Sequence, residues 1–260
     1  MNISRRKFFA AMTSAAATGA TATLPSHPLL QAAKLNLHSE RGLTCTLLDL
    51  SSSCALRESF DGYRIALIAL LGLHEPVSES DLSTIRRPRM AVVPGLGTMD
   101  PSTALTLATW LQAGTTVLLE TAAAFLSPAD FLSQRQLLRH YFGLEIRLPL
   151  DLWTTELGPH GGFHVSLIQR GSPKRPSEGQ HSVPYVSYCW PCEAQVRDFS
   201  RIVPVSANNS DVIATLDTVP VALRRRVGKG TLISLGSPMG PSLRAGDLQA
   251  HSWLQSVATQ

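Results

Sequence analysis

The run Cys189-Trp190-Pro191-Cys192 contains the residues whose types and spacing most directly indicate chemistry. Two cysteines separated by two residues are the arrangement of thiol–disulfide exchange, in which a helix that begins at the motif lowers the pKa of the first thiol. We predict a strand over residues 183–188 before the motif and a helix over residues 193–199 after it. Cysteines without a chemical role are the interpretation we favour, and redox exchange through Cys189 and Cys192 is the main alternative. The pair also supplies half of the ligands of a zinc site, but the spacing of the upstream histidines fits no familiar zinc finger.

Polar and glycine residues also follow two predicted buried strands, at residues 90–94 and 115–119. In sheets of parallel strands, ligands bind outside the carboxyl ends of the strands, and free backbone N–H groups bind carboxylate or phosphate groups. We therefore predict a ligand-binding crevice at these two strand ends. Its candidate residues are Gly95, Gly97, Glu120, Thr121 and Ser127. The alternative is that the glycines only allow close packing, and that Glu120 accepts hydrogen bonds from nearby amides.

Two helices with clear start and end signals must position these strand ends. Asp100-Pro101 predicts the start of a helix that Gly114 ends, and Ser127-Pro128 predicts the start of a helix that Gly143 ends. A polar cap followed by proline is typical of a helix start, and glycine is typical of the position just after a helix. The order strand, helix, strand, helix predicts an α/β unit with parallel strands.

The remaining elements flank this unit on both sides. Apolar residues at helical spacing predict a helix over residues 54–71, with a strand that begins near Ile65 as the competing interpretation. Two apolar runs around Gly228-Lys229-Gly230 predict a β-hairpin, in which Arg224 and Arg226 share one solvated face. Further expected elements are strands at residues 43–49 and 211–216 and a closing helix at residues 247–257.

Composition limits the classes of function. The chain has 260 residues, of which 44% are hydrophobic and 16% charged, and its formal net charge is +4. No basic stretch carries interleaved aromatic residues, so we expect no nucleic-acid partner. No apolar run approaches the roughly 20 residues of a transmembrane helix, so we expect no stable membrane span. The glycines at 95 and 97 are followed by Asp100 where a dinucleotide-binding pattern needs a third glycine, and we predict no cofactor and no metal.

The N-terminus carries a short motif with a specific meaning. Ser4-Arg5-Arg6-Lys7-Phe8-Phe9, followed by the weakly apolar residues 10–22, resembles a twin-arginine export signal. This resemblance implies a periplasmic or otherwise exported protein whose first partner is the twin-arginine export machinery. We predict that residues 1–33 are signal and linker, and that residues 34–260 form one α/β domain with an insertion at about 150–210.

Three runs carry a resemblance to a known family. They are Met90-Ala-Val-Val-Pro-Gly-Leu-Gly, Gly114-Thr-Thr-Val-Leu-Leu-Glu-Thr and Val227-Gly-Lys-Gly-Thr-Leu-Ile-Ser-Leu-Gly. Together they resemble the class I glutamine amidotransferase-like superfamily. This resemblance implies a flavodoxin-like fold with three layers, a mostly parallel sheet and helices on both faces, plus a C-terminal β-hairpin.

The same resemblance implies a member without catalytic residues. Active members have a cysteine nucleophile where this chain has Thr121, and a His-Pro-Glu run where it has Ser237-Pro238-Met239. A threonine hydroxyl without a base is a poor nucleophile. We therefore expect a non-catalytic periplasmic binding or accessory protein with an unknown protein or small-molecule partner. The alternatives are thiol–disulfide exchange and a hydrolase that uses Glu120 or Asp49, for which no partner residue can be named.

Overall fold

The computed structural model describes residues 45–50, 54–72, 75–121, 128–151, 153–157, 163–167, 185–198, 201–206 and 210–260. The chain divides into two compact units, Met1–His38 and Ser39–Gln260, and every described residue belongs to the second unit.

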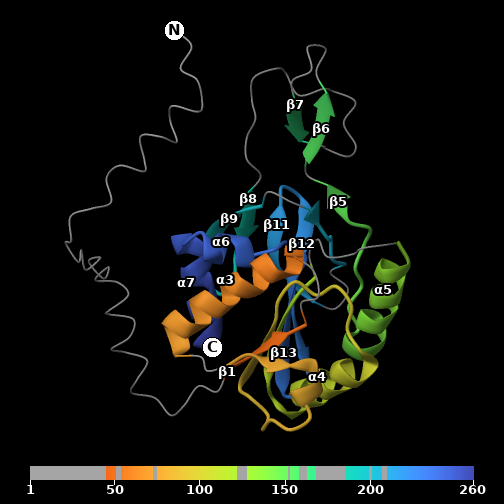
Figure 1. The fold of residues 1–260 in the computed structure, drawn as a ribbon, viewed down its shortest axis with the longest axis vertical. Helices are drawn as coiled ribbons and strands as arrows, with labels where there is room; N and C mark the ends of the chain where they lie inside the picture. The colour runs from red at the N-terminus through yellow and green to blue at the C-terminus, as the bar shows by residue number, and fades with distance from the viewer. Residues whose placement is uncertain are drawn as a thin grey trace, which may run out of the picture. The chain divides into compact units, whose positions relative to one another are not determined.

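A nine-stranded sheet forms the centre of this unit (Figure 1). Its strands lie in the order β2-β1-β3-β4-β13-β12-β11-β8-β9. Their bounds are β1 (Cys45–Asp49), β2 (Val77–Ser78), β3 (Met90–Val93), β4 (Thr116–Glu120), β8 (Tyr185–Tyr188), β9 (Ala194–Arg197), β11 (Asp211–Leu216), β12 (Val219–Val227) and β13 (Gly230–Leu235). Two small antiparallel pairs join β5 (Leu150–Asp151) to β10 (Arg201–Ile202), and β6 (Trp153–Leu157) to β7 (Phe163–Leu167).

The sheet is mixed, and the predicted flavodoxin-like, mostly parallel sheet is wrong. The pairs from β2 to β13 are parallel, whereas the pairs β13–β12, β12–β11, β11–β8 and β8–β9 are antiparallel. For the pairs β13–β12, β12–β11 and β8–β9 the reason is the short connection, because a turn of a few residues joins only antiparallel neighbours. The turn at Gly228 and Lys229 reverses the chain between β12 and β13, and short turns also join β11 to β12 and β8 to β9.

Helices pack on the two faces of the sheet, and successive residues of the central strands alternate between them. Val92 faces the core built with α3 (Cys54–Leu71), α6 (Gly240–Arg244) and α7 (Leu248–Ala258). Ala91 and Val93 face the core built with α4 (Pro101–Ala113) and α5 (Pro128–Phe142). Both faces of β3 are fully buried, as expected for a central strand of a parallel ladder. A short 3-10 helix, η1 (Glu79–Asp81), follows β2.

Most of the predicted helix and hairpin signals are confirmed. The first predicted helix runs over Cys54–Leu71, so the competing strand near Ile65 is wrong. Gly114 ends α4 with a φ of 115°, a left-handed conformation that glycine adopts without a steric penalty. The carboxylate of Asp247 caps α7 by accepting hydrogen bonds from the N–H groups of Gln249 and Ala250 at 2.9 and 3.1 Å.

Glycine allows α3 and α6 to touch backbone to backbone. A Cβ atom added at Gly62 would lie 1.8 Å from the carbonyl oxygen of Gly240. Glycine at position 62 lowers the intrinsic helix propensity of α3, but its missing side chain permits this packing. The close approach brings the N-terminal residues of α6 over the end of β4.

Candidate functional site

Among the described residues that sequence analysis assigned to the crevice, Glu120 is the acidic one, and it is fully buried. It lies at the end of β4, and its exposed fraction is 0%. The N–H of Gly95 donates to Oε1 at 3.2 Å, and the N–H groups of Met239 and Gly240 donate to Oε2 at 2.9 and 3.3 Å. The hydroxyl of Ser59 also donates to Oε1. One carboxyl group therefore links α3, the turn after β3, the end of β4 and the start of α6.

Burial determines the protonation behaviour of this group. Loss of solvation raises the pKa of Glu120, and the hydrogen bonds from Ser59, Met239 and Gly240 partly oppose that rise. Burial, followed by the charge of Glu120, raises the pKa of the Tyr63 hydroxyl, which faces the same carboxyl group. The cluster therefore favours fewer charges than the same groups would carry in water.

The neighbouring crevice candidates are also used inside the protein. Thr121 has an exposed fraction of 0%, and its hydroxyl donates to the carbonyl oxygen of Leu235 at 3.1 Å. Gly95 and Gly97 are buried in the turn after β3, whereas Ser127 lies outside the described residues. The structure thus brings Gly95 and Glu120 into direct contact, as the packing interpretation expected. A ligand at this crevice stays a prediction, and the Gly95 amide already has an acceptor.

The two cysteines of the Cys-Trp-Pro-Cys run lie in the turn that joins β8 to β9. Both are free thiols, Cys189 exposed and Cys192 half-buried. The sulfur of Cys189 lies 3.5 Å from the carbonyl oxygen of Ile213. Trp253 of α7 fixes the turn, because its indole N–H donates to the carbonyl oxygen of Trp190 at 2.7 Å.

The predicted helix over residues 193–199 is wrong, because this segment forms strand β9. Ala194 and Val196 are buried while Gln195 and Arg197 are exposed, which is the two-residue period of a half-buried strand. The thiols therefore lie in a hairpin turn. The argument that a helix N-terminus acidifies the first thiol does not apply there.

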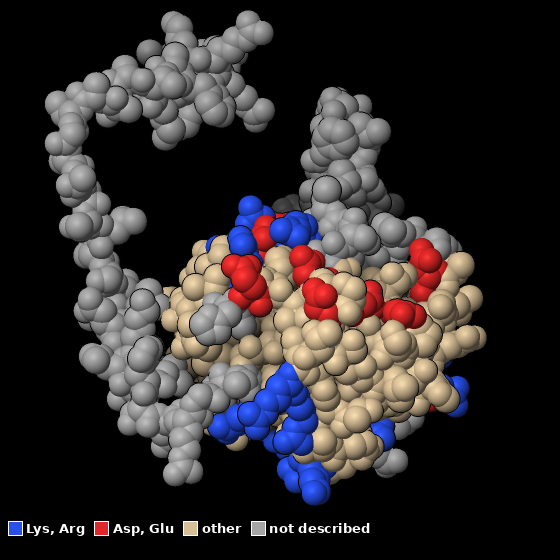
Figure 2. All heavy atoms as spheres, turned by 60° about the horizontal axis from the view of Figure 1, so that its bottom comes forward, with Lys and Arg blue, Asp and Glu red and all other residues tan. Residues whose placement is uncertain are grey.

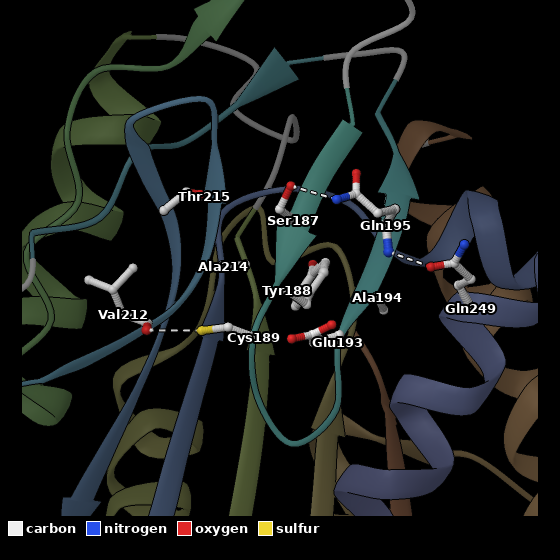
Figure 3. Close-up of a pocket in the computed structure, with 10 residues that line it drawn as sticks. All are labelled: Ser187, Tyr188, Cys189, Glu193, Ala194, Gln195, Val212, Ala214, Thr215 and Gln249. Carbon is white, nitrogen blue, oxygen red and sulfur yellow. Dashed lines mark hydrogen bonds between the residues drawn. The ribbon is translucent and has the colours of Figure 1, made fainter.

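A cavity of about 580 Å³ opens beside this turn, over β8, β9 and β11 (Figure 3). Its volume is within the range of about 300–1,000 Å³ that small-molecule sites occupy. The polar side chains that line it come from three strands, the β8–β9 turn and the first turn of α7. They are Ser187, Cys189, Glu193, Gln195, Thr215 and Gln249.

Gln195 makes two hydrogen bonds in the cavity, one through its side chain and one through its backbone. Its side-chain NH₂ donates to the Ser187 hydroxyl at 3.1 Å, and its backbone N–H donates to Oε1 of Gln249 at 2.6 Å. Figure 3 shows both contacts. These bonds leave Oε1 of Gln195, the NH₂ of Gln249 and the Thr215 hydroxyl without a partner among the described residues. A ligand would therefore meet two hydrogen-bond acceptors and two donors, since a hydroxyl serves as both.

Charge in the cavity is confined to one side chain. Glu193 is the only Asp or Glu among the ten residues that line it, and none of the ten is Lys, Arg or His. A carboxylate without a neighbouring cation repels anions. The cavity is therefore suited to uncharged or cationic ligands.

Sequence analysis missed this cavity because its residues are far apart in the chain and individually ordinary. The useful signal was the alternation of residues 185–188 and 194–197, which puts Ser187 and Gln195 on one face of a hairpin. Their cross-strand pairing follows only when residues 194–197 are recognised as a strand.

Two kinds of feature are absent from the residues that the structure describes. They contain no group of three or more His, Cys, Asp or Glu residues that could hold a metal ion. Among the described helices, none is long and apolar enough to cross a membrane.

Known proteins share the fold of this chain, but none of the comparisons assigns the chain to a family. No model of a protein family matches this chain, and no curated protein matches it. The β-galactosidase from Rahnella sp. R3 matches with a TM-score of 0.55 and 11% identity over 83% of this chain and 31% of that chain. The β-galactosidase from Bacillus circulans sp. alkalophilus matches with a TM-score of 0.50 and 14% identity over 81% of this chain and 31% of that chain. This chain thus spans about a third of these enzymes.

A third match covers almost the whole of its protein. It is a cytoplasmic protein from Salmonella typhimurium LT2, with a TM-score of 0.49 and 9% identity over 83% of this chain and 97% of that chain.

These findings correct the resemblance to the class I glutamine amidotransferase-like superfamily. The two β-galactosidase matches are not named as amidotransferases, and the sheet is not the one that the resemblance implied. The physical reason is that apolar strands followed by glycine-rich turns are required by many α/β sheets. The three runs therefore predicted secondary structure correctly and the family wrongly.

The predicted twin-arginine signal and periplasmic location are contradicted as well. Neither β-galactosidase match is named as an exported protein, and no comparison supports an export signal. Two arginines before a short apolar run form a motif of few positions, which also arises by chance. Ser4-Arg5-Arg6 and the rest of the motif lie outside the described residues.

Proposed function

We propose that this chain is a non-catalytic binding or accessory protein, and that its ligand occupies the cavity over β8, β9 and β11. The observation that carries the proposal is the contrast between two places in the same sheet. At the end of β4, the groups that could do chemistry are buried and bonded to the protein itself. Over β8 and β9, the polar groups are held in place and face open space.

The polar groups of the cavity favour an uncharged ligand with several hydroxyl groups. A ligand hydroxyl group can both donate and accept a hydrogen bond. Amide and hydroxyl side chains held in place therefore recognise it, because they offer donors and acceptors side by side. A carboxylate such as Glu193 accepts strongly from a hydroxyl group and discriminates against an acidic sugar. Because two structural neighbours are β-galactosidases, galactose is the first probe to use, beside mannose and glucose.

Titration calorimetry with these three hexoses and with galacturonate tests the proposal. We expect millimolar binding of at least one neutral hexose and about fivefold weaker binding in Gln195→Leu, because the substitution removes the acceptor Oε1 and with it one hydrogen bond to the ligand of about 1 kcal/mol. Gln136→Leu is the matched control, because Gln136 is exposed on α5, away from the cavity. The proposal is wrong if no hexose binds, if galacturonate binds as tightly, or if the Gln195 variant binds normally.

Thiol–disulfide exchange is the second candidate, and one observation favours it. Cys189 is an exposed free thiol in the same turn as the free thiol of Cys192. Under this hypothesis the protein catalyses insulin reduction, and Cys189→Ser abolishes that activity. A rate equal to the uncatalysed rate in the unaltered protein removes the candidate.

A further inference from the structure

Four cations gather at the C-terminal end of α4. We call Arg86, Arg87, Arg89 and Lys229 the basic rim. All four are exposed. Three precede β3 in the chain, and the fourth lies in the turn between β12 and β13. The basic rim is separate from the cavity over β8, β9 and β11, because none of its four residues lines that cavity.

Hydrogen bonds place three of these residues, Arg87, Arg89 and Lys229, around one short segment, residues 112–116. The guanidinium of Arg87 donates to the carbonyl oxygen of Ala113. The backbone N–H of Lys229 donates to the carbonyl oxygen of Gln112 at 3.3 Å. The carbonyl oxygen of Arg89 accepts from the N–H of Thr116 at 2.9 Å.

The end of α4 does not neutralise this charge. A helix C-terminus carries the equivalent of about half a negative charge, whereas the basic rim carries four positive charges. Among the described residues, no acidic side chain forms an ion pair with Arg86, Arg87 or Lys229. Figure 2, which brings the lower end of the sheet forward, shows Lys and Arg gathered on that face with Asp and Glu mostly gathered above them. An excess of positive charge therefore remains on the surface.

Apolar groups border the rim. Ile85 precedes Arg86, Val227 lies two residues before Lys229, and both are half-buried against the core under α4. Trp110, near the end of α4, is buried and offers no face on which a nucleic-acid base could stack. Cations beside small apolar patches are suited to a protein segment, and planar guanidinium groups bind carboxylates through paired hydrogen bonds.

We propose that the basic rim is a docking surface for an acidic segment of a partner protein, rich in Asp and Glu. It acts independently of ligand binding in the cavity. Attraction between the rim and carboxylates accelerates association and weakens with salt.

Fluorescence anisotropy with a labelled poly-L-glutamate peptide tests this inference. We expect binding at 50 mM salt, at least tenfold weaker binding at 200 mM salt, and at least tenfold weaker binding in the double variant Arg86→Glu/Lys229→Glu. Arg87 is left in place because it caps α4. The control is Arg64→Glu/Arg135→Glu, which changes the net charge equally at two exposed arginines on α3 and α5. Thermal unfolding of both variants checks that they fold.

Three outcomes overturn the inference. In the first, the rim variant and the unaltered protein bind the peptide equally. In the second, the control variant loses as much affinity, so net charge alone is responsible. In the third, single-stranded DNA of equal charge binds more tightly than the peptide and is lost in the rim variant, which identifies a nucleic-acid surface. Hexose binding by the rim variant Arg86→Glu/Lys229→Glu is expected to stay unchanged in every case, because neither residue lines the cavity, so this test and that of the proposed function fail separately.

Discussion

Substitution of Glu120 by glutamine tests the buried cluster directly. Both carboxyl oxygens accept hydrogen bonds, Oε1 from Gly95 and Ser59 and Oε2 from the N–H groups at the start of α6. Glutamine has only one oxygen, so its NH₂ must replace one of the two acceptors. The less costly orientation turns the NH₂ toward Ser59, whose hydroxyl can accept, and leaves the buried N–H of Gly95 without an acceptor. A buried donor without an acceptor costs about 1–3 kcal/mol, which is the expected loss in the free energy of unfolding.

The pH dependence of this loss follows from the raised pKa of Glu120. A carboxyl group whose folded pKa exceeds its unfolded value of about 4.3 stabilises the fold most fully below that value. This stabilisation is lost as the pH rises through the folded pKa, because the folded state holds the proton more tightly than the unfolded state. The stability advantage of the unaltered protein over Glu120→Gln is therefore larger at pH 4 than at pH 8.

Urea unfolding followed by tryptophan fluorescence at both pH values measures this difference. Glu75→Gln is the control, because Glu75 is exposed. Equal stability of Glu120→Gln and the unaltered protein at pH 4 would refute the role of the carboxyl group as an acceptor for several donors. If the stability advantage of the unaltered protein over Glu120→Gln instead grows with pH, the pKa of Glu120 is lowered on folding. The view that burial outweighs the hydrogen bonds in setting this pKa is then wrong.

Three further substitutions test the packing and the helix ends, each measured by urea or thermal unfolding. Gly62→Ala is expected to cost more than 3 kcal/mol, or to prevent folding, because the added Cβ meets the carbonyl oxygen of Gly240 at 1.8 Å; unchanged stability would show that α3 and α6 can separate freely. Asp247→Ala removes the cap of α7 and is expected to cost about 1 kcal/mol, whereas Asp247→Asn restores most of it. Arg225→Ala removes the hydrogen bond of 2.9 Å to the carbonyl oxygen of Gly143 at the end of α5, with an expected loss of about 0.5–1.5 kcal/mol.

Local signals in the sequence predicted local structure well. Caps, prolines and glycines located α4, α5 and α7 to within a residue or two, because each signal acts on the backbone of its own residue. The buried Glu120 was considered as an acceptor of amide hydrogen bonds before its partners were known. Two of those partners, Met239 and Gly240, could not be predicted, because they reach Glu120 only through the packing of α6 on α3.

Properties that depend on distant pairing were predicted poorly. The direction of β8 and β11 relative to the parallel strands is decided by which strand each one pairs with, and no residue in either strand encodes that choice. Residues 194–197 were too few to separate a helix from a strand by periodicity. That error displaced Gln195 from its strand and concealed the cavity.

The hydrogen bond between Gln195 and Gln249 also limits how far the sheet can grow. β9 is the last strand, so its outer backbone groups form an edge at which another chain can add a strand. The side chain of Gln249 accepts from the Gln195 N–H on this short strand, and α7 packs beside it. A change that loosens the first turn of α7, such as loss of the Asp247 cap, therefore does more than lower stability. It frees a polymerisation edge, and self-association of the chain should rise with it.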